Sequence, residues 1–384
     1  MLYEEKGRYG IPSHANRLRP GSWFFPPRHG TFPPGHMEQR EKILVGIVTN
    51  PASGRDIRRL VSCASLFPTS EKVSMVTRVI AALGAFGVDE VLLMPDHSGI
   101  AGGVLRAVRS HAARATDRWP DVRFIFQEVE QTANDTRRAV RAMLAQGVRT
   151  IVVLGGDGTH RVVASECGST PLVTLSTGTN NVFPDLREAT VAGMAAALCA
   201  TGKINHQSIC RRNKRLQVRV GDRCEIALVD VAISRSRYVG SRALWDPDDL
   251  SEIFVTFAEP DAVGLSSIAG LLRPTGRDVP EGCHVWLDAQ SPKQWLCAPI
   301  GPGLICALPV REVAALPPGV HTKIGLQRGT VALDGEREIE FAPNEFPTVW
   351  LDLDGPLTVD VRKTLDLAIR QGLLRKRFSI TNPQ

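Results

Sequence analysis

The sequence lacks the marks of several protein classes. None of its eight cysteines forms a C-x-x-C pair, and their spacing fits neither a zinc site nor a dense disulfide scaffold. No run approaches the ~20 apolar residues that a membrane-spanning helix needs, and the N-terminus has no apolar signal-peptide segment. No internal repeat and no DNA- or RNA-binding motif is present. We therefore expect buried free thiols, a cytoplasmic location, no membrane span and no nucleic-acid partner.

Length and positive charge are the chain's first positive features. It has 384 residues, of which 43% are hydrophobic, enough for more than one domain. Its formal net charge is +6, from 46 Lys and Arg against 40 Asp and Glu. This excess favours anionic ligands such as nucleotides or phosphates. A solvated basic surface is the simpler alternative to nucleic-acid binding.

Residues 1–40 differ from the rest of the chain. They hold six prolines, five glycines and six aromatic residues, without a helical or strand period. We predict a disordered extension there. Met37 is an alternative start, because the first strand pattern follows it directly.

Apolar strands alternate with amphipathic helices from residue 41 to about 208. The pattern predicts helices around Val73–Leu83 and over residues 102–113 and 132–146. It predicts strands over residues 43–48, 91–94, 124–126, 150–154 and 171–175. Short, fully apolar strands separated by helices indicate a doubly wound α/β domain with a parallel sheet. Ligands of such sheets bind at the carboxyl ends of the strands.

The pattern changes after residue 208, where short alternating segments and Pro or Gly turns dominate. We predict a β-rich domain over residues 209–356. Its expected strands are residues 216–220, 225–233, 253–257, 284–287, 294–298, 330–333, 338–341 and 349–353. Helical spacing returns in residues 357–384, where we predict a helix that packs back on the first domain.

A glycine-rich loop at the end of the 150–154 strand carries the strongest functional signal. Gly155, Gly156 and Gly158 let the backbone approach an anion with its N–H groups exposed. Thr159 can cap the following helix, whose N-terminus favours a phosphate. Asp157 can hold Mg²⁺ or accept a hydroxyl proton. The alternative is a tight strand-to-helix turn in which Asp157 only caps the helix.

Two further loops follow predicted strands and can line the same cleft. The first ends the strand at residues 43–48, and its hydroxyl and N–H groups can surround an anion. The second offers two hydroxyls and an amide after the strand at residues 171–175. Plain polar turns are the alternative for both. The nucleotide-binding candidates in these loops are Asn50, Ser53, Gly54, Thr177, Gly178, Thr179 and Asn180.

Acidic and basic residues outside these loops leave alternatives open. Asp230 lies in an apolar segment, where a ligand ribose, a metal or a structural hydrogen bond would offset the cost of burying a carboxylate. Asp334 and Glu336 flank a glycine and are candidates for an acidic, metal or base role, or for a plain hairpin turn. His160 can contact a phosphate or simply begin a helix. The basic run 211–215 can attract a nucleotide or be a solvated connector.

Several of these motifs together resemble a known superfamily over most of residues 43–375. Residues 155–159 resemble the G-G-D-G-T signature of NAD kinases and diacylglycerol kinases, and residues 50–54 resemble their N-P-x-S-G loop. Residues 176–181 resemble the G-T-G-N-D segment of the lipid kinases, and residues 334–336 resemble their D-G-E motif. Within the superfamily, residues 50–60, 155–161 and 332–338 resemble the ATP-NAD kinase-like acetoin catabolism protein X group.

The resemblance implies a kinase that uses ATP or another phosphoryl donor together with Mg²⁺, has no fixed protein metal site and is linked to acetoin catabolism. NAD is the implied acceptor, through its ribose hydroxyl, with Asp157 as the catalytic residue and Asn180 and Asp230 near the ribose. Nucleotides and dinucleotides are the expected ligands of a homo-oligomer. Val229 stands where NAD kinases have an asparagine, and Asn181 where lipid kinases have an acidic residue. A lipid or other small-alcohol kinase and a non-catalytic nucleotide sensor therefore stay open.

Overall fold

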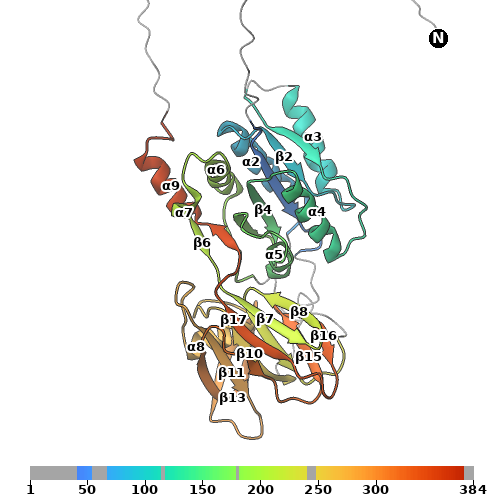
Figure 1. Ribbon diagram of the computed structural model, residues 1–384, viewed down its shortest axis with the longest axis vertical. Helices are drawn as coiled ribbons and strands as arrows, with labels where there is room; N and C mark the ends of the chain where they lie inside the picture. The colour runs from blue at the N-terminus through green and yellow to red at the C-terminus, as the bar shows by residue number, and fades with distance from the viewer. Residues whose placement is uncertain (1–40, 54–66, 114–116, 179–180, 240–247, 376–384) are drawn as a thin grey trace, which may run out of the picture. The chain divides into compact units, whose positions relative to one another are not determined.

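The computed structural model describes residues 41–53, 67–113, 117–178, 181–239 and 248–375 (Figure 1). The predicted disordered extension, with Met37, lies outside these residues. So do three of the candidate site residues, Gly54, Thr179 and Asn180.

The first part of the chain forms a seven-stranded sheet in the order β3-β2-β1-β4-β5-β18-β6. All strands except β6 are parallel to their neighbours, and β6 runs antiparallel to β18. Every residue of β1 and β4 is buried, because helices cover both faces of the sheet. The strands are β1 Leu44–Thr49, β2 Glu90–Leu93, β3 Asp121–Phe124, β4 Thr150–Gly155, β5 Leu172–Ser176, β6 Cys210–Arg212 and β18 Leu357–Val359.

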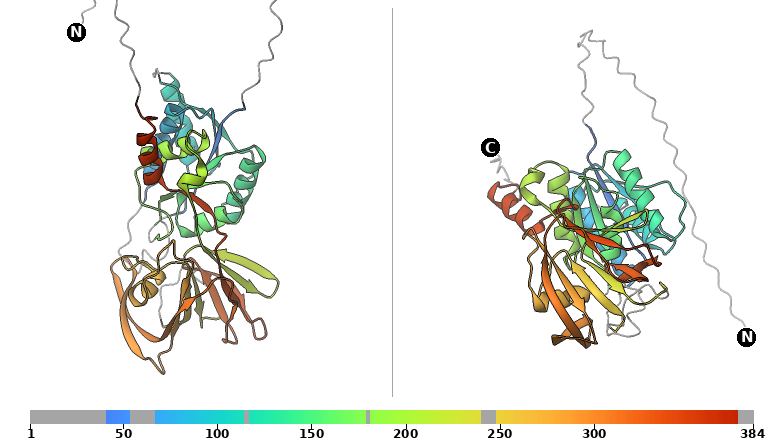
Figure 2. Two further views of the ribbon diagram at one scale, coloured as in Figure 1. Left: turned by 60° about the vertical axis from the view of Figure 1, so that its left-hand side comes forward. Right: turned by 60° about the horizontal axis from the view of Figure 1, so that its bottom comes forward.

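Helices divide between the two faces of this sheet. α2 (Thr69–Ala85), α3 (Ile100–Ala112), α6 (Ala189–Ala200) and α9 (Val361–Arg370) share one apolar core with it. On the other face lie α4 (Ala133–Ala145) and α5 (Asp157–Ala164). The predicted doubly wound α/β architecture is confirmed. The C-terminal helix α9 packs against α6 and the short α7 (His206–Ile209), as Figure 2 also shows.

The strand-rich part has two antiparallel sheets, drawn in yellow to red in Figure 2. The larger has the order β12-β13-β11-β10-β9-β15-β16, and the smaller β14-β17-β7-β8. One apolar cluster includes side chains of both sheets, and a second lies under helix α8 (Leu265–Leu272). The strands are β7 Arg215–Val220, β8 Arg223–Ala227, β9 Asp230–Ser234, β10 Leu250–Val255, β11 Gly282–Leu287, β12 Gln294–Gly301, β13 Leu304–Leu316, β14 Thr322–Lys323, β15 Gly329–Leu333, β16 Glu336–Phe341 and β17 Thr348–Asp352.

Three expectations about individual elements were wrong. The segment 225–233 is not one strand, because the chain leaves the smaller sheet after β8 and enters the larger sheet at β9. The strand expected at residues 124–126 ends at Phe124, and the side chain of Phe126 is fully exposed. The run 211–215 is not a wholly solvated connector, because Asn213 and Lys214 are buried.

Candidate functional site

The three strand ends named by the sequence lie side by side. β4 pairs with β1 on one side and with β5 on the other, all parallel. Beyond the strands, the N–H of Asn50 donates to the carbonyl oxygen of Leu154 at 3.0 Å. The N–H of Thr177 donates to the carbonyl oxygen of Gly155, also at 3.0 Å. The loops after β1, β4 and β5 therefore form one polar edge of the sheet.

Asn50 joins the loop after β1 to helix α5. Its Oδ1 accepts the N–H of Ala52 at 2.8 Å, which closes a tight turn. Its Nδ2 donates to Oγ1 of Thr159 at 2.8 Å. Both ends of the Asn50 amide are thus engaged within the chain, and the residue positions other groups.

A chain of hydroxyls joins the first and third loops. Ser53 Oγ donates to the carbonyl oxygen of Asn50 at 2.9 Å and lies 2.9 Å from Oγ1 of Thr177. A hydroxyl has one hydrogen, so Thr177 must be the donor to Ser53. Neither hydroxyl hydrogen is then directed at a ligand, and this pair fixes the distance between the loops.

Thr159 differs from these two hydroxyls. It does not cap α5, because the N-cap residue is Gly156 and no side chain caps this helix end. Its Oγ1 accepts from Asn50, which leaves its hydroxyl hydrogen available to donate. Gly155 is required beside it, because a Cβ at that position would lie 2.5 Å from the Thr159 Cβ. Thr159 is the best placed side-chain donor at the start of α5.

Asp157 anchors a neighbouring segment of the chain. Its carboxylate accepts the N–H of Phe183 at 2.9 Å and the N–H of Val182 at 3.1 and 3.2 Å. On the other side of the segment, Arg277 donates to the carbonyl oxygens of Val182 at 2.5 Å and Phe183 at 3.3 Å. Arg277 belongs to the strand-rich part, between α8 and β11. The backbone N–H groups of residues 182–183 are therefore held by a negative charge and their carbonyl oxygens by a positive one.

His160 is buried inside the site's framework. Its side chain is inaccessible to solvent, and Nδ1 donates to the carbonyl oxygen of Gly156 at 2.8 Å. Burial lowers the pKa of His160 to about 4, although hydrogen bonds to backbone carbonyls oppose the shift. A neutral, buried imidazole supports the turn before α5 and does not act as a cation for phosphate.

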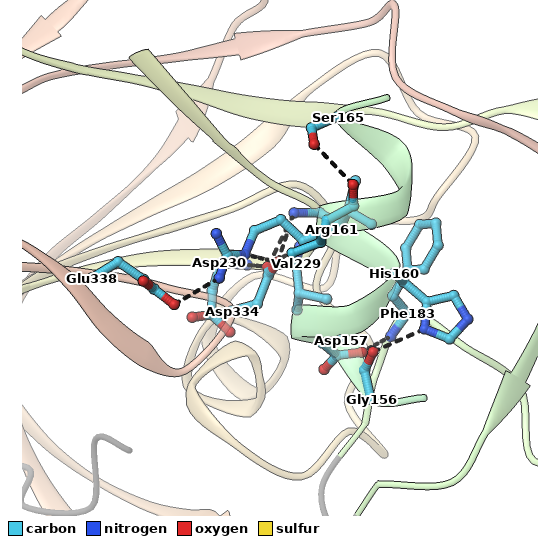
Figure 3. A network of polar contacts seen from close by, with 12 residues as sticks. Gly156, Asp157, His160, Arg161, Ser165, Phe183, Val229, Asp230, Asp334 and Glu338 are labelled. Atoms are coloured by element: carbon cyan, nitrogen blue, oxygen red, sulfur yellow. Dashed lines mark hydrogen bonds and ion pairs between the residues drawn. The ribbon is translucent and has the colours of Figure 1, made fainter. Parts of the chain in front are cut away.

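An ion-pair network connects α5 with the β15–β16 hairpin (Figure 3). Nη2 of the buried Arg161 donates to Oε1 of Glu338 at 3.0 Å, and its Nε lies 3.5 Å from Oδ2 of Asp334. Asp334 also accepts the N–H groups of residues 228–230 at 2.8–3.3 Å. Burial raises the pKa of the Asp334 carboxyl, and Arg161 and these amides oppose the shift. Asp334 thus holds the break between β8 and β9.

Glu336 and Asp230, the other acidic candidates, lie close to this network in the chain. The hairpin turn at Asp334–Gly335 has φ of 51° and 78°, as expected for a two-residue turn. The turn brings the Glu336 carboxyl to 3.7 Å from the position of a Cβ on Gly158, in the first turn of α5. Asp230 is buried at the start of β9, and its carbonyl oxygen accepts the N–H of Asp334. Glu336 therefore lies beside the first turn of α5.

Three charged residues of the framework were missed by the sequence reasoning. Arg161 follows the glycine loop directly, which is a usable signal. Lys72 shares the buried face of α2 with Met75, Val76 and Val79, so a charge at an apolar position marks it. Arg277 carries no local signal, because only the folded chain brings it to residues 182–183.

The described residues contain neither a cluster of metal ligands nor a membrane-spanning helix. Within the ranges that the structure describes, no group of three or more His, Cys, Asp or Glu side chains is arranged to hold a metal ion. In the same part of the chain, no helix is long and apolar enough to cross a membrane.

Comparison with known proteins agrees with this architecture. Residues 45–204 match the ATP-NAD kinase N-terminal domain, and residues 214–354 match the acetoin catabolism protein X C-terminal domain. The chain is 43% identical to acetoin catabolism protein X of Cupriavidus necator over 341 residues, which cover 86% of this chain and 94% of the relative. The two matched regions correspond to the parallel-sheet part and the strand-rich part. The chain therefore belongs to the acetoin catabolism protein X family, built on an NAD kinase-like N-terminal domain.

Proposed function

We propose that the protein is a kinase that transfers the terminal phosphoryl group of ATP to a ribose hydroxyl of NAD or a similar dinucleotide, in service of acetoin catabolism. One observation carries the proposal. The loops after β1, β4 and β5 converge on the start of α5, whose N-terminus has no side-chain cap. The first N–H groups of a helix have no partner within it and carry partial positive charge, so this end suits a phosphate.

The residues at this end of α5 fit a nucleotide phosphate. Gly156 and Gly158 would allow close backbone contact, and Thr159 would donate its hydroxyl hydrogen. Mg²⁺ bound together with ATP would supply positive charge that neutralises the phosphate oxygens. Glu336 would face that complex from the hairpin. Phosphoryl transfer depends mainly on such positioning and charge stabilisation.

The acceptor side of the proposal uses the remaining candidates. Asp157 would accept the proton of the acceptor hydroxyl, because a carboxylate can act as the general base for an alcohol in phosphoryl transfer. Asn180 and Asp230 would hold the ribose. Thr177 and Gly178 would line the same edge.

A non-catalytic nucleotide sensor is the second candidate. It is favoured by the contacts of Asp157, whose carboxylate is engaged by the N–H groups of Val182 and Phe183. A carboxylate held in this way has a structural role without any catalysis. Under this alternative the same loops bind a nucleotide, and the signal passes through residues 182–183.

Two measurements on the purified full-length chain separate the candidates. The first is nucleotide affinity by calorimetry, with and without Mg²⁺. The second is phosphate transfer from labelled ATP to NAD, with diacylglycerol and small alcohols as other acceptors. Formation of NADP supports the proposal. Transfer to another acceptor keeps the kinase activity in the proposal but replaces NAD with that acceptor. Tight ATP binding with no transfer supports the sensor, and no nucleotide binding refutes both.

A further inference from the structure

A buried lysine holds the loop after β1. Lys72 lies in the first turn of α2, and only 1% of its surface is exposed. Its ammonium donates to the carbonyl oxygen of Asn50 at 2.9 Å, of Pro51 at 3.1 Å and of Ser53 at 2.8 Å. An ammonium has three N–H donors, so it can donate to all three of these carbonyls.

The contacts of Lys72 set the orientation of the peptide groups in the loop after β1. The C=O and N–H of a trans peptide point in opposite directions, so the Pro51 carbonyl, which is turned toward Lys72, directs the N–H of the same peptide the other way. The amide that follows Pro51 is the N–H of Ala52, which donates to Asn50 Oδ1. That bond orients the Asn50 side chain toward Thr159. The ammonium thus acts on the start of α5 through the loop.

We propose that Lys72 is a positioning residue that holds residues 50–53 in their ligand-ready conformation before a nucleotide binds. The cost of burying a charged side chain is a physical reason to assign it a purpose, since an apolar residue would pack at this position of α2 without that cost. The nucleotide part of the inference rests on the proposed function.

The chain offers a matched control in the strand-rich part. Lys214 is also buried and donates to three loop carbonyls, of Gly276 at 2.9 Å, Val279 at 2.8 Å and Glu281 at 2.7 Å. These carbonyls belong to the segment between α8 and β11. Lys214→Met removes the same chemistry without touching the loop after β1.

The experiment compares Lys72→Met with Lys214→Met in the full-length chain. We expect Lys72→Met to weaken ATP binding at least about tenfold more than Lys214→Met does, at similar loss of thermal stability. Equal losses of affinity would overturn the inference, because they would show a general effect of destabilisation. Lys72→Gln keeps two N–H donors and should recover part of the affinity.

Hydrogen exchange tests the same idea without ATP and without a variant that must fold. The amides of Asn50, Ala52 and Ser53 should exchange slowly in the ligand-free wild type, because the loop is already ordered. Fast exchange there, slowed only by ATP, would show that the ligand orders the loop and would refute the role of Lys72. If the wild type binds no ATP, the proposed function fails, while slow exchange still supports a loop held by Lys72.

Discussion

Asp157→Asn is the substitution that best separates catalysis from support. Within its contacts with residues 182–183, Oδ1 of Asp157 accepts the N–H groups of both Val182 and Phe183, and Oδ2 accepts that of Val182. An asparagine with its oxygen at the Oδ1 position keeps both contacts but places an NH₂ group about 3.1 Å from the N–H of Val182. Weaker neutral hydrogen bonds and two facing donors should together cost about 2 kcal/mol of unfolding free energy.

The chemical effect should be larger than the structural one. If Asp157 accepts the acceptor's proton, its loss should slow transfer by ~10²-fold, or about 2.7 kcal/mol in the barrier. ATP affinity should change little, because in the proposed binding mode backbone N–H groups would contact the phosphates. Single-turnover transfer, calorimetric affinity and thermal unfolding of one preparation give the three numbers.

A second variant isolates the carboxylate. Arg277→Met removes the contacts on the opposite side of residues 182–183 and should also cost about 2 kcal/mol of stability. It leaves Asp157 in place, so its transfer rate should fall by less than about tenfold. Equal rates in wild type and Asp157→Asn would refute the catalytic role and favour the sensor. Equal losses in both variants would assign the effect to the segment.

Three further predictions concern the surroundings of α5. Thr159→Val removes the available hydroxyl donor and should weaken ATP binding about tenfold. Glu336→Gln removes a carboxylate near the start of α5, so ATP without Mg²⁺ should bind more tightly. The increase in ATP affinity that Mg²⁺ produces should shrink about fivefold, because two charges ~4 Å apart interact by about 1 kcal/mol in water. The pKa of His160 is lowered from 6.5 to about 4, so its stabilising contribution is complete above pH 6.5 and is lost as pH falls toward 4. His160→Gln should therefore remove about 3 kcal/mol of the acid-induced loss in unfolding free energy.

Each of these has its own control. Thr177→Val is the partner of Thr159→Val, because the Thr177 hydroxyl hydrogen is directed at Ser53. A larger loss of ATP affinity in Thr177→Val than in Thr159→Val would contradict the assignment of Thr159 as the available hydroxyl donor. An unchanged Mg²⁺ effect in Glu336→Gln would remove that carboxylate from the metal's surroundings. For His160, identical unfolding curves of wild type and variant between pH 7 and 4 would show that the imidazole is not buried neutral.

Local chemistry was sufficient to predict the framework of the fold. Strands such as β1 and β4 are runs of apolar residues because both faces of a parallel sheet are covered, and that pattern is visible without coordinates. The turn at Asp334–Gly335 is likewise local, because its positive φ angles favour glycine. The glycine loop at residues 155–158 is also visible as a short run of neighbouring residues. Helix α6 was less visible, because it is buried on most sides and has no polar face to give a period.

Contacts between distant residues could not be predicted in this way. The segment 225–233 reads as one apolar strand, yet the Asp334 carboxylate, about a hundred residues later, binds the amides at its break. Lys72, Arg161 and Arg277 have hydrogen-bond or ion-pair partners on other parts of the fold, and Arg161 and Arg277 have partners in the other matched region. Sequence patterns report which face of an element is buried, but not which element covers it.

The sequence by itself therefore determined the superfamily fold, the order of its loops and the position of the candidate phosphate site, because each depends on residue types within a few positions of one another. Only the tertiary structure decided which polar groups are engaged and which are available. It left Thr159 with a hydroxyl hydrogen to donate, engaged those of Ser53 and Thr177, and placed Asp157 against residues 182–183. The physical reason is that a hydrogen bond needs a partner within about 3 Å, and only folding sets that distance between residues far apart in the chain.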